Sequence, residues 1–107
     1  MQKPTLFVVL LLFCSHFAVS QDKKVLFIGN SYTFMEDIPD LFYQVANSTG
    51  DVLIVDSETN GGATFEFHAT EQVVTDKINS DDWDYVILQG ASVEVALTGT
   101  YFDTNVA

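Results

Sequence analysis

Cysteine, histidine and basic residues are scarce in this chain of 107 residues, and each shortage narrows what the protein can do. The one cysteine, Cys14, lies in an N-terminal apolar stretch, so disulfides and thiolate metal sites are excluded once that stretch is removed. Four basic residues stand against 15 acidic ones, which gives a formal net charge of −11. This charge repels nucleic-acid phosphates and anionic lipids, so we expect neither as a partner. The sequence supports no metal and no other cofactor.

Residues 1–20 have the pattern of a secretory signal peptide. Lys3 provides the positive start, residues 6–13 form an unbroken apolar run, and Ala18-Val19-Ser20 offers small residues at a cleavage site. The run is shorter than the roughly 20 residues that span a bilayer, although an uncleaved N-terminal anchor remains the alternative. We therefore expect a secreted or periplasmic protein, free of the membrane after cleavage, in which residues 21–107 belong to one small domain.

Three short apolar runs rich in β-branched residues predict buried strands at 24–29, 52–55 and 84–89. Two segments with helical spacing, 38–48 and 65–79, lie between them. Alternation of strand and helix favours an α/β fold with a parallel sheet and helices on its faces, with a mixed α+β arrangement as the alternative. Three strands make a small sheet with an open edge, so we expect a domain that is truncated after the third strand.

Residues at the ends of the two helices fit this interpretation. Asp37 is placed to cap the first helix and Gly50 to end it, and Thr64 is placed to cap the second. After the second helix, Asp81-Asp82-Trp83-Asp84 has some resemblance to a calcium loop but lacks the full ligand spacing and a closing glutamate. We therefore expect a solvated turn there.

Small and polar residues follow all three predicted strands. They occur at 29–33, 60–64 and 89–92. Because ligands of open parallel sheets bind beyond the carboxyl ends of the strands, these three loops are expected to form one site. Each loop also has a simpler explanation, in which its polar residues only build turns and helix caps.

Three residues in these loops carry the candidate chemistry. Ser31 follows Gly29, which lets the chain turn, and is either a reactive hydroxyl at the rim or a cap or turn residue. Gly62, in a Gly-Gly pair, either exposes an N–H to developing negative charge or makes a flexible turn. Gln89 either donates its amide to an oxyanion or satisfies a loop carbonyl.

Taken together, three blocks resemble the first three conserved blocks of the SGNH/GDSL hydrolase superfamily. They are Val25-Leu26-Phe27-Ile28-Gly29-Asn30-Ser31-Tyr32-Thr33, Gly61-Gly62-Ala63-Thr64, and Asp84-Tyr85-Val86-Ile87-Leu88-Gln89-Gly90-Ala91-Ser92. The resemblance is closest to exported bacterial esterases. It implies a flavodoxin-like three-layer α/β/α fold, Ser31 as the nucleophile, and the N–H groups of Ser31 and Gly62 as oxyanion donors.

The third and fourth blocks depart from the family pattern. The superfamily usually has Gly-x-Asn-Asp in the third block, whereas this chain has Gln89-Gly90-Ala91-Ser92, similar to a Gln-Gly-Glu-Ser variant in which the glutamine is the third donor. The fourth block, Asp-x-x-His, does not occur, so the catalytic histidine and aspartate are expected outside this chain. His68 either serves as the base or, as we favour, packs or hydrogen-bonds at the start of its helix.

The sequence thus predicts a serine ester hydrolase that works through a Ser31 acyl-enzyme, with Ser31, Gly62 and Gln89 around the oxyanion. Its expected substrate is a small-molecule or carbohydrate ester, such as an acetylated sugar, and the chain alone is expected to have little or no activity. The alternative is a non-catalytic flavodoxin-like domain that binds a glycan or a small anion at the same rim.

Overall fold

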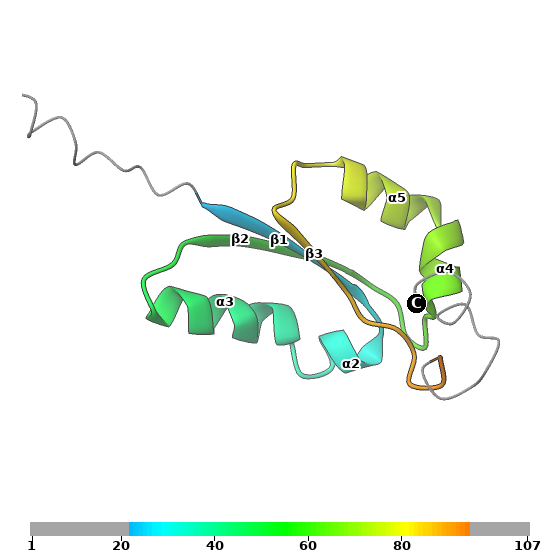
Figure 1. Cartoon of the computed structure of the whole chain (residues 1–107). Helices are drawn as coiled ribbons and strands as arrows, with labels where there is room; N and C mark the ends of the chain where they lie inside the picture. The colour runs from blue at the N-terminus through cyan, green and yellow to red at the C-terminus, as the bar shows by residue number, and fades with distance from the viewer. Residues whose placement is uncertain (1–21, 95–107) are drawn as a thin grey trace, which may run out of the picture.

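A computed structural model describes residues 22–94, in which strands and helices alternate along the chain (Figure 1). The elements are β1 (Lys23–Gly29), α2 (Ser31–Phe34), α3 (Ile38–Ser48), β2 (Leu53–Thr59), α4 (Phe65–Thr70), α5 (Gln72–Asn79) and β3 (Tyr85–Leu88). The predicted signal peptide and Cys14 lie outside the described residues. No helix within residues 22–94 is both long enough and apolar enough to cross a bilayer.

The three strands form one parallel sheet in the order β2-β1-β3. β1 pairs with β2 along its whole length, from Lys23 opposite Leu53 to Gly29 opposite Thr59. β3 pairs with the second half of β1, from Val25 opposite Tyr85 to Ile28 opposite Leu88. The predicted α/β class with a parallel sheet is therefore confirmed, and the strand order is that of the first three strands of a flavodoxin-like sheet.

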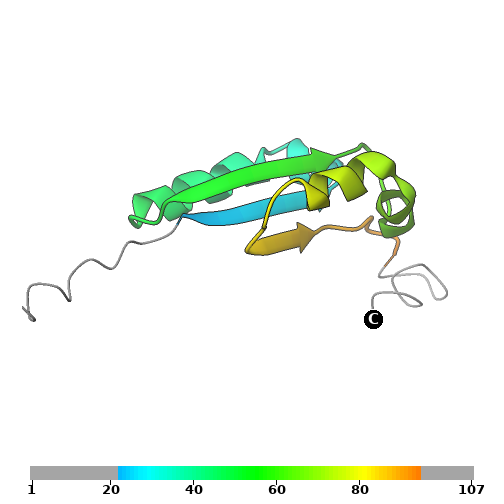
Figure 2. The ribbon, with the colours of Figure 1, turned by 90° about the horizontal axis from the view of Figure 1, so that it is seen from above.

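Alternate residues of the central strand β1 face opposite layers of the structure. Phe27 contacts Phe42 of α3 edge to face, with 5.5 Å between the ring centroids. Leu26 and Ile28 point the other way and form a buried cluster with Val74 of α5. Helices α3 and α5 consequently cover opposite faces of the sheet, as Figure 2 shows from above. This is the three-layer arrangement that the sequence predicts.

Burial is uneven across the sheet. Residues 25–28 of β1 are buried, as predicted for a strand covered on both faces. The four residues of β3 are exposed, and those of β2 are mostly half-buried. The prediction that all three strands are buried is thus wrong for β2 and β3 in the part of the chain that the structure describes. Within residues 22–94 both strands lie at the edges of the sheet, where each has a paired strand on one side only.

The helix predicted over 65–79 and the strand predicted over 52–55 differ most from the elements observed, whereas β1 and β3 differ from their predicted bounds by one residue at one or both ends. The helix expected over 65–79 is interrupted at Glu71, which has extended backbone angles of φ −83° and ψ 123°. The interruption separates α4 from α5, and α5 then brings Val74 onto the sheet. β2 continues beyond the predicted apolar run through polar residues 56–59 because its backbone pairs with β1 over the full length.

The outer boundaries of the predicted helices agree with the structure, which has helical residues from 38 to 48 and helices that begin at 65 and end at 79. One of the two predicted N-caps forms no side-chain hydrogen bond. Thr64 Oγ1 accepts the Phe67 N–H at 3.1 Å, as predicted for the cap of α4. Asp37 is the N-cap residue of α3, but its side chain makes no capping hydrogen bond. Its φ of 46° lies in the left-handed region, where residues other than glycine are strained. Gly50, with φ 91°, follows the end of α3 as expected.

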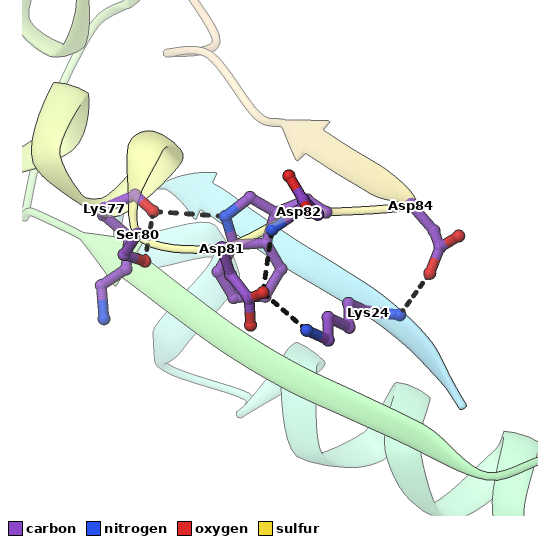
Figure 3. A network of polar contacts seen from close by, with 7 residues as sticks. Lys24, Lys77, Ser80, Asp81, Asp82 and Asp84 are labelled. Carbon is purple, nitrogen blue, oxygen red and sulfur yellow. Dashed lines mark hydrogen bonds and ion pairs between the residues drawn. The ribbon is translucent and has the colours of Figure 1, made fainter. Parts of the chain in front are cut away.

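The turn before β3 is held by the start of β1 (Figure 3). Lys24 Nζ binds Asp81 at 2.6 Å, and the Lys24 N–H donates to Asp84 at 2.8 Å. The hydrogen bond from Lys24 Nζ lowers the pKa of Asp81, and the bond from the Lys24 N–H lowers the pKa of Asp84. The indole of Trp83 donates to Lys77 O at 3.2 Å. These contacts anchor the predicted turn.

Residues 22–94 contain no cluster of histidine, cysteine and carboxylate side chains suited to a metal ion.

Candidate functional site

The candidate site lies where the chain reverses direction across the sheet. From β1 the chain crosses to β2 on one side and then returns over β1 to β3 on the other side. Helices α3 and α5 of these two crossovers cover opposite faces of the sheet, so a topological switch point lies between the carboxyl ends of β1 and β3. In open α/β sheets this switch point is where ligands bind. The loop of Ser31 and the loop of Gln89 meet there.

Asn30 joins all three candidate loops. It is 2 % exposed and is the N-cap residue of α2, where its Oδ1 accepts the Tyr32 N–H at 3.1 Å. Its N–H donates to Gln89 Oε1 at 3.0 Å, and its Nδ2 donates to Ala63 O at 3.0 Å. One asparagine thereby fixes the end of β1, the loop before α4 and the loop after β3. The convergence of the three loops that the sequence predicts is present in the structure.

Ser31 is the first residue of α2 and is half-buried. It directly follows Asn30, which contacts both other loops, so the Cα atoms of these two residues are about 3.8 Å apart. Neither its Oγ nor its N–H makes a hydrogen bond to any residue in 22–94. The capping role considered for Ser31 belongs to Asn30 instead. Ser31 therefore presents a hydroxyl and a backbone donor at the same rim.

Gly62 lies in the exposed loop between β2 and α4. Its φ of 69° is in the left-handed region, which glycine adopts without strain. The next residue, Ala63, is buried and its carbonyl oxygen accepts the side-chain N–H of Asn30, so the loop is tied to Asn30 directly after Gly62. The Gly62 N–H has no partner within the described part of the chain, and it remains a candidate donor.

Gln89 follows β3 directly and turns its side chain toward β1. Its Oε1 accepts the Asn30 N–H at 3.0 Å and the Thr33 hydroxyl at 2.9 Å. A backbone N–H can only donate, so the atom facing Asn30 must be the carbonyl oxygen of Gln89. The Nε2 of Gln89 donates to Gly90 O. Of the two roles considered from the sequence, the structure shows that this amide satisfies a loop carbonyl, and the amide retains a second N–H.

His68 of α4 contacts the end of β1, two residues before Ser31. It is 6 % exposed in α4, and its Nε2 lies 3.0 Å from Gly29 O. A carbonyl oxygen only accepts, so Nε2 carries a proton and donates it to Gly29 O. Nδ1 is buried and has no partner among residues 22–94. This confirms the favoured prediction that His68 packs and hydrogen-bonds, because in this arrangement neither nitrogen is available to Ser31.

Sequence reasoning missed two residues that shape the site. Thr33 is 4 % exposed and reaches Gln89 from the first turn of α2. Glu94 is 3 % exposed, and its carboxylate accepts the Phe65 N–H at 2.8 Å and the Ala91 N–H at 2.6 Å. Glu94 thereby ties the loop after β3 to the start of α4. Thr33 lies within a motif that the sequence singles out, whereas Glu94 follows the last predicted strand and has no periodic pattern around it.

Two hollows lie near the sheet but away from the Asn30 junction. One of about 220 Å³ is on the α5 face and is lined by Ile28, Phe65, His68, Ala69, Val74, Ile78 and Leu88. Another of about 550 Å³ lies between α3 and β2, with Asp37, Asp40 and Asp56 along its wall. Neither is lined by Ser31, Gly62 or Gln89. The candidate site is therefore the rim itself, formed by loop backbone and short polar side chains.

Comparisons of the chain with protein-family models, with curated proteins and with solved structures gave no match.

Proposed function

We propose that this rim is the acyl-transfer site of a serine ester hydrolase of the SGNH type, with Ser31 as its nucleophile. The observation that carries the proposal is the junction at Asn30. Its N–H and side-chain amide contact Gln89 and Ala63, each at 3.0 Å, which brings two further loops to the residue beside Ser31. A hydroxyl and several unengaged N–H donors at one rim are what acyl transfer requires.

In the proposed reaction, Ser31 Oγ attacks the carbonyl carbon of an ester and its proton passes to a base. The carbonyl oxygen becomes an oxyanion that accepts the N–H of Ser31, the N–H of Gly62 and an Nε2–H of Gln89. Collapse of this intermediate breaks the bond to the alcohol, which leaves with a proton and yields the acyl-enzyme. Water then attacks the acyl-enzyme in the same way, releasing the acid and restoring Ser31.

His68, the one histidine within residues 22–94, is not placed to serve as this base. Both nitrogens of His68 are buried, and its Nε2 is engaged by Gly29 O. We propose that an Asp-x-x-His segment of the complete protein supplies this base. Without it, the oxyanion donors and substrate binding remain, and the rate falls by a factor on the order of 10⁴ or more.

A short acyl group on a carbohydrate is the substrate we favour. The proposed signal peptide would deliver the protein to the periplasm or the exterior, where polysaccharide esters occur. Tyr32, directly after Ser31, is 66 % exposed and offers an apolar ring and a phenol to a sugar. The Gln-Gly-x-Ser form of the third block, which resembles that of some carbohydrate esterases, also favours a carbohydrate ester as substrate. The partner is thus a small-molecule or carbohydrate ester, and the reaction needs no cofactor.

The test is covalent labelling of the protein expressed from its complete reading frame. A fluorophosphonate should modify Ser31, as identified by peptide mass spectrometry, and an acetyl ester should be hydrolysed. Ser31→Ala should abolish both. Ser80→Ala is the matched control, because Ser80 lies in the turn at the opposite end of the sheet and should leave both unchanged (Figure 3).

Two results would contradict the proposal. One is hydrolysis that survives Ser31→Ala. The other is a complete protein that neither hydrolyses esters nor reacts at Ser31 but binds a glycan or an anion at the rim, which would establish the non-catalytic alternative.

A further inference from the structure

The carboxamide of Gln89 is oriented by two donors from the segment around Ser31. Asn30 N–H and Thr33 Oγ1–H both donate to its Oε1, at 3.0 and 2.9 Å. An amide whose oxygen accepts two hydrogen bonds on one side must present its NH₂ group on the other side. One N–H of that group bonds to Gly90 O, and the second has no partner within residues 22–94. This second N–H is the one that an oxyanion can use.

Thr33 reaches Gln89 because Gly29 leaves the space between them empty. A Cβ on Gly29 would overlap the Thr33 hydroxyl and would lie 2.9 Å from Gln89 Oε1. Threonine in a helix often returns its hydroxyl to the carbonyl of the preceding turn. Here that carbonyl, Gly29 O, already receives Asn60 N–H and His68 Nε2–H. The Thr33 hydroxyl is therefore directed to Gln89.

We propose that Thr33 is a positioning residue, whose hydroxyl holds the Gln89 carboxamide with an N–H directed toward the oxyanion. The inference rests on the proposed function, and it adds a residue that acts through Gln89 without touching substrate. The Asn30 N–H is a backbone group and cannot be removed by changing its side chain. Thr33 is thus the one of the two donors whose contribution can be tested by substitution.

The first experiment measures the orientation of Gln89 and needs no activity. In ¹⁵N-labelled protein, the two side-chain NH₂ protons of Gln89 should be well separated in shift and should exchange slowly with solvent. Thr33→Val keeps the shape of the side chain but removes the hydroxyl, so the separation should shrink and exchange should accelerate severalfold. Thr33→Ser should retain the wild-type pattern. Unchanged Gln89 resonances in Thr33→Val would overturn the proposal.

The second experiment measures catalysis in the complete protein. Loss of an oxyanion donor typically lowers kcat by about 10²- to 10³-fold, and a loosened donor should cost less, on the order of tenfold in kcat with little change in KM. Thr33→Ser should recover most of that loss. Thr75→Val, on the exposed surface of α5, is the control for the chemical change itself and should match wild type.

A double-mutant cycle then identifies the path of the effect. If Thr33 acts through Gln89, adding Thr33→Val to Gln89→Ala should cause no further loss of kcat. A full additional tenfold loss would overturn the proposal by showing that Thr33 acts independently. If the complete protein has no Ser31-dependent activity while the Gln89 resonances still respond to Thr33→Val, the proposed function fails and the role toward an oxyanion fails with it. The orienting contact itself would then stand as a structural one.

Discussion

His68 Nε2 donates a hydrogen bond to Gly29 O at 3.0 Å and so links helix α4 to the last residue of the central strand. Gly29 O also accepts the Asn60 N–H at 3.1 Å. The carbonyl that precedes the Ser31 turn is thus held by two donors from the crossover between β2 and β3. This gives His68 a structural role at the base of the site.

Replacement of His68 should affect stability more than chemistry. His68→Leu removes one of two donors to Gly29 O, and we expect a loss of about 1–2 kcal/mol in the free energy of unfolding. His68→Gln, which can still reach with an amide N–H, should lose less. Urea unfolding measures both variants, and a long-range ¹H–¹⁵N spectrum should show the His68 proton on Nε2. A drop on the order of 10⁴-fold in Ser31 reactivity in His68→Gln would instead identify His68 as the base.

Asn30→Asp should destabilise the protein markedly. The substitution replaces the Nδ2 donor to Ala63 O by a carboxylate oxygen, so two acceptors would face each other in a buried position. We expect a loss of about 2–3 kcal/mol in the free energy of unfolding, together with faster amide exchange in the loop of Gly62. Asn79→Asp, on the exposed end of α5, serves as the control and should change stability by less than about 0.5 kcal/mol. Equal effects of the two variants would show that Asn30 does not join the loops.

Three glycine substitutions should separate steric from conformational demands. Gly29→Ala must displace Thr33 or Gln89, and we expect a loss of about 1–3 kcal/mol in the free energy of unfolding. Gly62→Ala meets open space but requires a positive φ, at a cost of roughly 1 kcal/mol. Gly61→Ala has neither demand and should be nearly neutral. Thermal unfolding of the three variants tests this order, which any reversal between Gly29 and Gly61 would contradict.

The ion pair of Asp56 and Lys77 should give a modest pH dependence. Lys77 Nζ lies 2.8 Å from Asp56 Oδ2 and joins α5 to β2. Burial of Asp56 acts to raise its pKa, but the hydrogen bond from Lys77, the Ser57 N–H and the charge of Lys77 outweigh it and lower the pKa overall. The hydrogen bond to Asp56 raises the pKa of Lys77.

The signs of these shifts define the pH window. The folded-state pKa of Asp56 is below its unfolded value, so its stabilisation is complete above about pH 4 and is lost as the pH falls through the folded value. The folded-state pKa of Lys77 is raised, so its contribution is complete below about pH 10 and is lost as the pH rises through the folded value. Because the Asp56 side chain is 44 % exposed, screening by solvent limits the pair to less than about 1 kcal/mol.

Lys77→Met should therefore lower stability slightly near neutral pH, and the difference from wild type should vanish in strong acid and shrink in high salt. Urea unfolding at several pH values measures this. Lys23→Met, which removes the longer and more exposed ion pair with Asp84 at 3.3 Å, is the comparison and should lose less stability. A difference for Lys77→Met that persists after Asp56 is protonated would show that the methylene chain of Lys77, and not its charge, provides the stabilisation.

Several features of the fold could be predicted because they depend on local chemistry. The apolar, β-branched run that forms β1 predicts a buried strand, and β1 is the buried centre of the sheet. The spacing of apolar residues over 38–48 predicts α3 with the bounds observed. Thr64 caps α4 because a threonine hydroxyl can satisfy an early N–H of a helix wherever that helix packs. Each of these predictions needs only residues close together in the sequence.

Other features depend on contacts between distant segments and left no local pattern. Glu71 interrupts a helix whose spacing is continuous in the sequence, and Val74 of the second helix, α5, packs against Leu26 and Ile28 of β1. Asp37 has a left-handed conformation where a side-chain cap was expected. The role of Glu94 depends on Phe65, 29 residues earlier. No window of neighbouring residues contains such information.

The sequence by itself determined the alternation of strand and helix, the parallel sheet that this alternation requires, and the three loops in which Ser31, Gly62 and Gln89 occur. Tertiary structure alone decided that Asn30 joins those loops, that His68 donates to the carbonyl of Gly29, and that the Thr33 hydroxyl donates to Gln89. The physical reason is that secondary structure follows from propensity and periodicity within a few residues. The direction of a buried polar side chain is set by whichever unpaired donor or acceptor the packing brings beside it.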